Sequence, residues 1–93
     1  MSRLHAPNCE RRQFRDDLKR QKRRGKDIGD LIAAVELLAE QGALPAAYRA
    51  HKLSGEWSGV WECHIEPDWL LIYVVTDEVI LLIRTGTHAD LFG

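Results

Sequence analysis

The sequence predicts an α+β domain in which two N-terminal helices pack on one face of a three- to four-stranded antiparallel sheet. Three observations support this fold class. Apolar residues recur at helical spacing between residues 8 and 42. Three strand-like apolar runs follow residue 59, and their short connections favour an antiparallel meander. The 93 residues suffice for a single domain, spanning 1–93, with a modest core.

The first helix is predicted to begin at Asn8, which is a good N-cap, and to stop at Gly25. Phe14 and Leu18 form an i, i+4 apolar pair on this helix. The segment before it, residues 2–6, is a candidate edge strand, because the sheet in the second half of the chain gains from another partner.

A second helix is predicted between a cap at Asp27 and a stop at Gly42. Its apolar residues recur at helical spacing: Ile28, Leu31, Ile32, Val35, Leu38 and Ala39. The two helices are expected to form an αα-hairpin whose apolar stripe covers the sheet. Residues 43–59 contain proline and glycine without a clear period, so they are predicted to be a loop.

Three strands are predicted in the second half of the chain: residues 60–65, 69–76 and 79–85. Pro67 has a fixed φ and no N–H, so residues 66–68 are expected to turn between two antiparallel strands. Residues 77–78 are predicted to join the last two strands. Residues 86–93 are expected to be a short tail.

The polar positions of these strands are expected on the sheet face that the helices leave open. Strand alternation puts Glu62 and His64 on one face of the first strand. On the last strand Arg84 shares a face with Ile80 and Leu82, so a charge interrupts the apolar alternation. The predicted polar site combines strands, loop and tail: Glu62, His64, Arg84, His51 and His88.

Positive charge is concentrated at the N-terminal end. Residues 1–26 contain ten Lys or Arg and three acids, a net +7, whereas the other 67 residues contain three bases and eleven acids, a net −8. Such a basic end predicts a polyanionic partner, either nucleic acid or an acidic protein. A solvated helix rich in arginine explains the same charges equally well, so charge alone leaves both explanations open.

The composition indicates a soluble protein. No apolar run approaches the roughly 20 residues of a membrane span, and no signal peptide is recognisable. Cys9 and Cys63 are expected to be free thiols in a reducing cytoplasm. We therefore expect cytoplasmic localisation, no membrane contact and no disulfide.

Histidine chemistry is the main functional signal. His51, His64 and His88 fall in or beside the sheet region, and Asp68 is expected close to His64. No histidine pair has metal-binding spacing and the cysteines form no C-x-x-C, so no metal is expected. Histidines with a carboxylate and an arginine can cleave RNA through its own 2′-hydroxyl. One group takes the hydroxyl proton, a second protonates the 5′-oxygen, and a cation stabilises the phosphorane.

Aromatic residues add a second indication of RNA, because Trp69 and Phe92 could stack on unpaired bases. Each residue also has a simpler interpretation: a tryptophan at a strand start is more often core, His64 a surface histidine and Asp68 a turn residue. These simpler explanations are favoured one at a time. They are weaker jointly, because sheet, loop and tail all deliver polar groups to one surface.

Four segments resemble one family: KRRGKD at 22–27, HKLSGEWSG at 51–59, ECHIEPDWLLIY at 62–73 and RTGTHADLF at 84–92. The chain is similar over nearly its whole length to the YafQ-type toxins of the RelE-like superfamily, the mRNA interferases of bacterial type II toxin–antitoxin systems. The resemblance implies a RelE-like fold and ribosome-dependent cleavage of translated mRNA, in frame at adenine-rich codons. It also implies no cofactor and neutralisation by a DinJ-like or RelB-like antitoxin.

Carried over position by position, the resemblance implies two groups of site residues. The catalytic group is His51, His64, Asp68 and His88, and the substrate-binding group is Arg84, Trp69, Phe92, Lys52 and Glu62. His88 is preferred as the general acid, since a tail can reach the leaving oxygen. Trp61 departs from the family pattern, because related toxins often carry an arginine there. Arg84 and Lys52 are therefore expected to supply more of the positive charge.

Two other functions remain open at this point. The same superfamily fold serves ParE-like toxins, which inhibit DNA gyrase by protein contact and need no histidine cluster. The chain could also be a plain RNA-binding domain, in which case alanine at His64 or His88 leaves growth inhibition intact. The free toxin is expected to be monomeric, and its complex with the antitoxin a hetero-oligomer.

Overall fold

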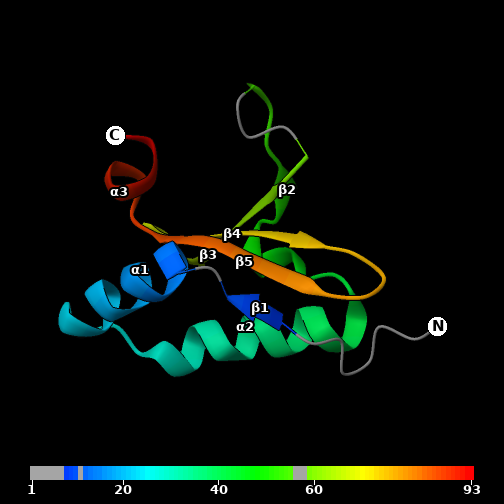
Figure 1. Ribbon diagram of the computed structural model, residues 1–93, viewed down its shortest axis with the longest axis horizontal. Coiled ribbons are helices and arrows are strands. Elements are labelled where there is room, and N and C mark those ends of the chain that lie inside the picture. The colour runs from blue at the N-terminus through cyan, green and yellow to red at the C-terminus, as the bar shows by residue number, and fades with distance from the viewer. Residues whose placement is uncertain (1–7, 11, 56–58) are drawn as a thin grey trace.

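The computed structural model describes residues 8–10, 12–55 and 59–93. Its elements follow in the order β1 (Asn8–Glu10), α1 (Arg12–Arg23), α2 (Ile28–Gln41), the 3-10 helix η1 (Ala46–Tyr48), β2 (His51–Lys52), β3 (Trp61–Glu66), β4 (Trp69–Val75), β5 (Ile80–Gly86) and α3 (His88–Phe92). The strands form one sheet in the order β1-β5-β4-β3-β2. Figure 1 shows α1 and α2 below this sheet and α3 above one end of it.

The α+β fold is confirmed, with four antiparallel strands and the added parallel strand β1. The predicted start of the first helix is wrong, because Asn8 does not cap a helix. Asn8–Glu10 instead pair with Ile80–Leu82 of β5, and α1 begins at Arg12. The strand satisfies backbone groups on an edge of β5 that the meander alone leaves open. The candidate edge strand at residues 2–6 lies outside the described residues.

The helix ends follow the predicted signals. The Asp27 side chain accepts a hydrogen bond from the Gly29 N–H at 2.9 Å and so caps α2. Gly42 closes the same helix in a left-handed conformation, with φ of 72°, and its N–H bonds the carbonyl of Leu38. Among the described helices, none is long and apolar enough to cross a membrane.

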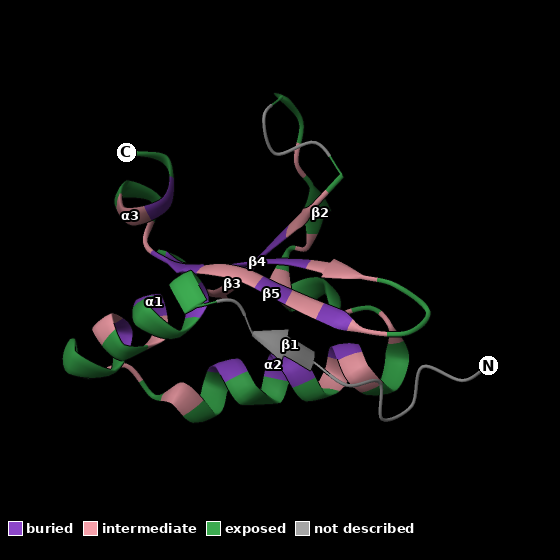
Figure 2. Cartoon of the chain, in the orientation of Figure 1, coloured by how far each residue is buried: buried purple, intermediate pink, exposed green. Residues whose placement is uncertain are grey.

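The main core lies between the two long helices and the sheet, as the purple inner surfaces in Figure 2 show. It consists of four helix side chains and six strand side chains: Phe14, Leu31, Val35, Leu38, Cys63, Trp69, Leu71, Tyr73, Ile80 and Leu82. A smaller core of Leu70, Ile72 and Leu91 covers the opposite face. Residues 86–93 are therefore not a simple tail, because they include a helix that packs back on the sheet.

A register shift changes the predicted face of the last strand. Tyr73 pairs with Leu82 and Ile72 pairs with Arg84, so Ile83 is an extra residue between the two pairs. Leu82 belongs to the main core. The expectation that Arg84 shares a face with Leu82 is therefore wrong, because the bulge interrupts the alternation.

Candidate active site

Glu62 lies between two histidines. The residues predicted as a loop contain β2, which pairs His51 with Glu62, and strand alternation puts His64 on the same side as Glu62. His51 Nε2 is 3.4 Å and His64 Nε2 is 3.8 Å from Glu62 Oε1. The Glu62 side chain is 7% exposed, so this carboxylate has been taken out of water. Each imidazole is within ion-pair distance of this carboxylate and can donate to it from Nε2 when both ring nitrogens are protonated.

The other ring nitrogen of each histidine faces a backbone carbonyl. His51 Nδ1 lies 3.1 Å from the Arg49 oxygen, and His64 Nδ1 lies 3.3 Å from the Pro67 oxygen. A carbonyl can only accept, so both contacts favour a proton on Nδ1. Nε2, which faces Glu62, is then the ring nitrogen of each histidine that is left to accept or release a proton.

Asp68 holds His88. The predicted turn before β4 places Asp68 where its Oδ1 accepts from the backbone N–H of His88 at 2.9 Å and faces His88 Nδ1 at 2.6 Å. The backbone hydrogen bond and the side-chain hydrogen bond of His88 lower the pKa of Asp68 below its usual value. Asp68 was expected close to His64, and its hydrogen-bond partner is His88. His88 Nε2 is the ring nitrogen that remains for a substrate.

These two groups form one histidine–carboxylate surface, which consists of His51, Glu62, His64, Asp68 and His88. The rings of His64 and His88 connect the groups, with centroids 6.0 Å apart and planes inclined by 52°. The four predicted catalytic residues are thus gathered on one surface. Within the part of the chain that the structure describes, no three His, Cys, Asp or Glu residues are arranged to hold a metal ion.

Arg84 is engaged by Asp17. Its Nε donates to Asp17 Oδ2 at 2.6 Å and its Nη2 to Oδ1 at 3.1 Å. Asp17 is only 2% exposed and also accepts the Thr85 backbone N–H at 3.2 Å. A buried carboxylate on α1 thus holds the Arg84 guanidinium, and the phosphate contact of Arg84 stays a prediction. This bidentate ion pair ties β5 to α1.

Trp69 was expected to stack on bases, and this expectation is wrong. The side chain is fully buried, and its Nε1 donates to Thr85 Oγ1 at 2.8 Å. Phe92, by contrast, is 45% exposed at the end of α3. Lys52 Nζ lies 5.8 Å from the centroid of the Trp61 ring, within reach of a cation–π contact. Lys52 and Phe92 thus remain accessible to a substrate, and Trp69 does not.

Sequence reasoning missed Asp90. Thr87 and Asp90 form a capping box at the start of α3, in which each side chain accepts the other residue's backbone N–H. The pattern T-x-x-D was visible in the sequence and is a known helix-start signal. It predicts the helix that carries His88, although not the arginine contacts that Asp90 also makes.

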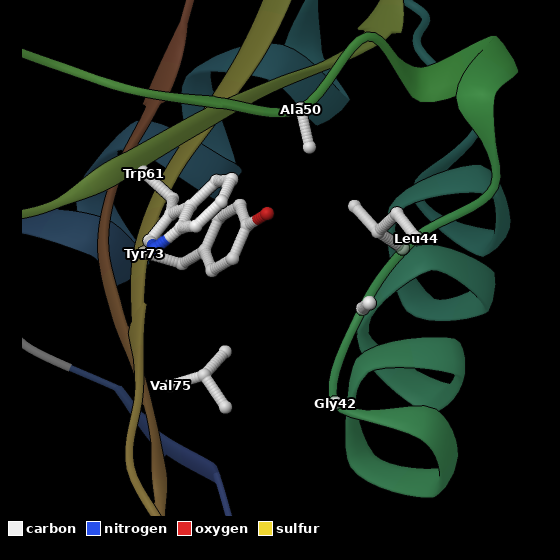
Figure 3. Close-up of a pocket in the computed structure, with 7 residues that line it drawn as sticks. Gly42, Leu44, Ala50, Trp61, Tyr73 and Val75 are labelled. Carbon is white, nitrogen blue, oxygen red and sulfur yellow. The ribbon is translucent and has the colours of Figure 1, made fainter.

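A separate hollow lies on the helix side of the sheet, with a volume of about 320 Å³. Figure 3 shows the ring of Tyr73 beside that of Trp61, with the Tyr73 hydroxyl pointing toward the segment of Leu44 and Ala50. Burial raises the pKa of Tyr73. No residue of the histidine–carboxylate surface lines this hollow, so it is not the candidate active site.

The chain is closely similar to known toxins. A model of the family described as a bacterial toxin of type II toxin-antitoxin system, YafQ, matches residues 8–93. The mRNA interferase toxin YafQ of Escherichia coli K12 is 45% identical over 82 residues, covering 87% of this chain and 89% of that protein.

Solved structures agree with this assignment. The toxin in a crystal structure of the E. coli DinJ-YafQ toxin-antitoxin complex has a TM-score of 0.87 and 41% identity, covering 97% of this chain and 100% of that chain. A metal-bound toxin from Helicobacter pylori has a TM-score of 0.81 and 34% identity, covering 89% and 94%. The chain therefore belongs to the YafQ family of toxins of bacterial type II toxin–antitoxin systems.

Proposed function

We propose that this toxin is an endoribonuclease that cuts translated mRNA on the ribosome, using the histidine–carboxylate surface as its catalytic site. The relative named mRNA interferase toxin, 45% identical over most of the chain, supports endoribonuclease activity. The observation that carries the proposed site is the approach of His64 and His88, whose ring centroids are 6.0 Å apart. Two imidazoles at this separation can exchange protons with two different oxygens of one phosphodiester.

His88 acts as the general acid. Asp68 occupies its Nδ1 side, so Nε2 points away from that hydrogen bond and can deliver a proton. The proton goes to the 5′-oxygen when the bond between phosphorus and that oxygen breaks. Asp68 keeps the ring in the productive tautomer throughout, which is the usual role of a carboxylate beside a catalytic histidine.

The general base is one of the two histidines beside Glu62. His64 and His51 both direct Nε2 at Glu62, and either imidazole can take the proton of the 2′-hydroxyl as its oxygen attacks phosphorus. The products are a 2′,3′-cyclic phosphate and a 5′-hydroxyl, and no water is consumed in this step. Before the products form, the imidazolium that results from this proton transfer stabilises the negative charge on the phosphorane. The reaction requires no cofactor.

Two macromolecular partners follow from this function. The ribosome presents the mRNA, and a DinJ-like or RelB-like antitoxin neutralises the free toxin, which we expect to be monomeric in the cytoplasm. The E. coli complex with DinJ supports the antitoxin partner. Three basic side chains of α1, Arg15, Lys19 and Lys22, border one hollow and have no ion pair with a described residue. They are suited to an acidic surface of either partner.

Primer extension on mRNA in a translating extract tests this proposal. The wild type is expected to make discrete, in-frame cuts that disappear when translation is blocked. His64→Ala and His88→Ala should each reduce cleavage by about 10²–10⁴-fold. Glu78→Gln, an exposed change in the β4–β5 turn, is the control. Growth arrest with intact mRNA would contradict the proposal and point to a protein target such as gyrase.

A further inference from the structure

The helix α3, which carries the proposed general acid His88, is too short to be stable without contacts to the rest of the domain. α3 has five residues, His88–Phe92, and an isolated helix of this length is unstable in water. Its apolar anchor is Leu91, which is 8% exposed and packs with Leu70 and Ile72. One buried leucine keeps α3 packed on the sheet, but it does not by itself fix the orientation of the His88 side chain.

Asp90 provides a second anchor through Arg24, in the turn that follows α1. Its two oxygens accept from one guanidinium, Arg24 Nη1 to Oδ2 at 2.6 Å and Arg24 Nη2 to Oδ1 at 3.1 Å. Oδ2 also accepts the Thr87 backbone N–H at 2.9 Å. The side-chain hydrogen bond from Arg24 is the largest cause that holds the pKa of Asp90 well below its usual range. Asp90 thus remains an anion bound both to the start of α3 and to the turn after α1.

Gly86 fits closely under the same carboxylate. This glycine ends β5 with φ of 154°, and a Cβ built on it would lie 2.8 Å from Asp90 Oδ2 and 3.0 Å from Asp90 Cβ. The first contact is shorter than real Cβ atoms show, and the second is tighter than nine in ten real Cβ contacts. Asp90 therefore occupies the space that a larger residue at 86 would need, and α3 is seated directly on the end of the strand.

A line of alternating charges extends from this contact to the sheet. Arg20 lies between two carboxylates, with its Nη2 3.0 Å from Asp17 Oδ1 and its Nε 3.7 Å from Asp90 Oδ2. Asp17 in turn binds Arg84 at 2.6 Å. The order Arg84, Asp17, Arg20, Asp90, Arg24 connects β5, α1 and α3, so the position of α3 depends on that of α1.

We propose that Arg24, acting through Asp90, is a positioning residue that fixes the orientation of His88 for proton transfer. His88 lies two residues before Asp90 in the same turn, and Asp68 holds its backbone N–H and Nδ1. His88 is thus fixed by Asp68 on one side and, through Asp90 and Arg24, by the turn after α1 on the other. This inference rests on the proposed nuclease function, in which His88 donates the proton.

Single-turnover cleavage at saturating ribosome concentration tests the proposal. Arg24→Gln is expected to lower the cleavage rate by about tenfold or more, because small displacements of a catalytic group are costly. Ribosome affinity should be unchanged, and Arg24→Lys should restore part of the rate. Lys26→Gln is the control, since it breaks another ion pair of the same length, Lys26–Glu66 at 2.6 Å, whose cation is 35% exposed against 40% for Arg24. Its cleavage rate should equal that of the wild type.

Two double variants separate positioning from direct contact with RNA. In a His88→Ala background, Arg24→Gln should cause no further loss of rate, because there is no imidazole left to position. Combined with Asp90→Asn, Arg24→Gln should cost no more than either change alone. An Arg24 that contacts ribosomal RNA directly gives the opposite result, namely weaker ribosome binding and a full effect in both backgrounds. That result would overturn the proposal.

Hydrogen exchange of the Leu91 amide, which donates to the Thr87 carbonyl at 3.1 Å, is a readout that needs no catalysis. Arg24→Gln should raise this exchange by about tenfold, since local opening of α3 becomes easier while global unfolding changes little. Unchanged exchange would reject the anchor even if cleavage fell. Two results together would reject the nuclease function and retain the anchor. These are intact translated mRNA with the wild-type toxin and faster exchange of the Leu91 amide in Arg24→Gln.

Discussion

Asp68 and His88 are joined by two hydrogen bonds to a single oxygen. Asp68 Oδ1 accepts the backbone N–H of His88 at 2.9 Å and contacts His88 Nδ1 at 2.6 Å. The first contact fixes the start of α3, and the second fixes the ring. A carboxylate on the turn between β3 and β4 therefore controls both the position and the tautomer of the proposed general acid.

Replacing Asp68 by asparagine separates these two effects. The amide oxygen can still accept the backbone N–H, but the negative charge that supports the imidazolium is lost. Asp68→Asn should therefore lower single-turnover cleavage by about 10–10²-fold, less than the loss in His88→Ala. Glu78→Gln serves as the exposed control. Equal cleavage by Asp68→Asn and wild type would show that the contact is only a helix cap.

Glu62 is expected to be as important as the histidines. Its carboxylate is buried between His51 and His64 and can stabilise positive charge on either ring. Glu62→Gln keeps the shape and removes the charge, so cleavage should fall by about 10–10³-fold while the circular dichroism spectrum stays unchanged. Glu66→Gln, on the same strand but in the half-exposed pair with Lys26, should retain wild-type cleavage. Loss of cleavage in both variants would indicate that general damage to β3 is the cause.

Local signals in the sequence predicted the local parts of the structure. Asp27 and Gly42 mark the ends of α2, and the three long strands lie within one residue of their predicted starts. The helical and strand periods of the apolar residues are sufficient for this, because each depends only on near neighbours.

Long-range pairings could not be predicted in the same way. Asp17 and Arg84 are separated by 67 positions, and no spacing rule connects residues so far apart in the chain. The bulge at Ile83 redirected Arg84, and the pairing of β1 with β5 overrode the capping preference of Asn8. The four predicted catalytic residues were nevertheless placed together from their positions on strand, turn, loop and tail, and the resemblance to a family supplied their expected roles.

Acidification should weaken the anchoring of α3. The pKa values of Asp68 and Asp90 are lowered in the folded state, by hydrogen bonds from His88 and from Arg24 respectively. A carboxyl group of this kind stabilises the fold above its unfolded pKa of about 3.9, and the stabilisation is lost as the pH falls below that value.

Urea unfolding between pH 7 and pH 3 measures this effect. The free energy of unfolding of the wild type should decrease more steeply below about pH 4 than that of Asp90→Asn, which has no proton to bind at this position. The two proteins should therefore converge in stability as the pH falls. Parallel curves would show that the Asp90 contacts contribute no net stability.

Trp69 is expected to affect stability and not RNA binding. Its indole is fully buried, and Nε1 donates to Thr85 Oγ1, which donates in turn to the Leu70 carbonyl at 2.6 Å. Trp69→Phe removes this donor and leaves a small cavity, so the free energy of unfolding should fall by about 1–3 kcal/mol. Urea unfolding at pH 7 provides the value. A change in RNA affinity without a change in stability would restore the original expectation that Trp69 stacks on a base.

The basic side of α1 is expected to face an acidic partner. Arg20 and Arg24 are neutralised by Asp17 and Asp90, whereas Arg15 and Lys19 have no ion pair with a described residue. Arg15→Glu with Lys19→Glu should therefore weaken association with an acidic partner by at least about tenfold at low salt and by less at high salt. Titration against ribosomes and, separately, against the antitoxin identifies which partner uses this surface. Unchanged affinity for both would mean that the positive charge of α1 serves only solubility, and that the partners recognise the toxin through other faces.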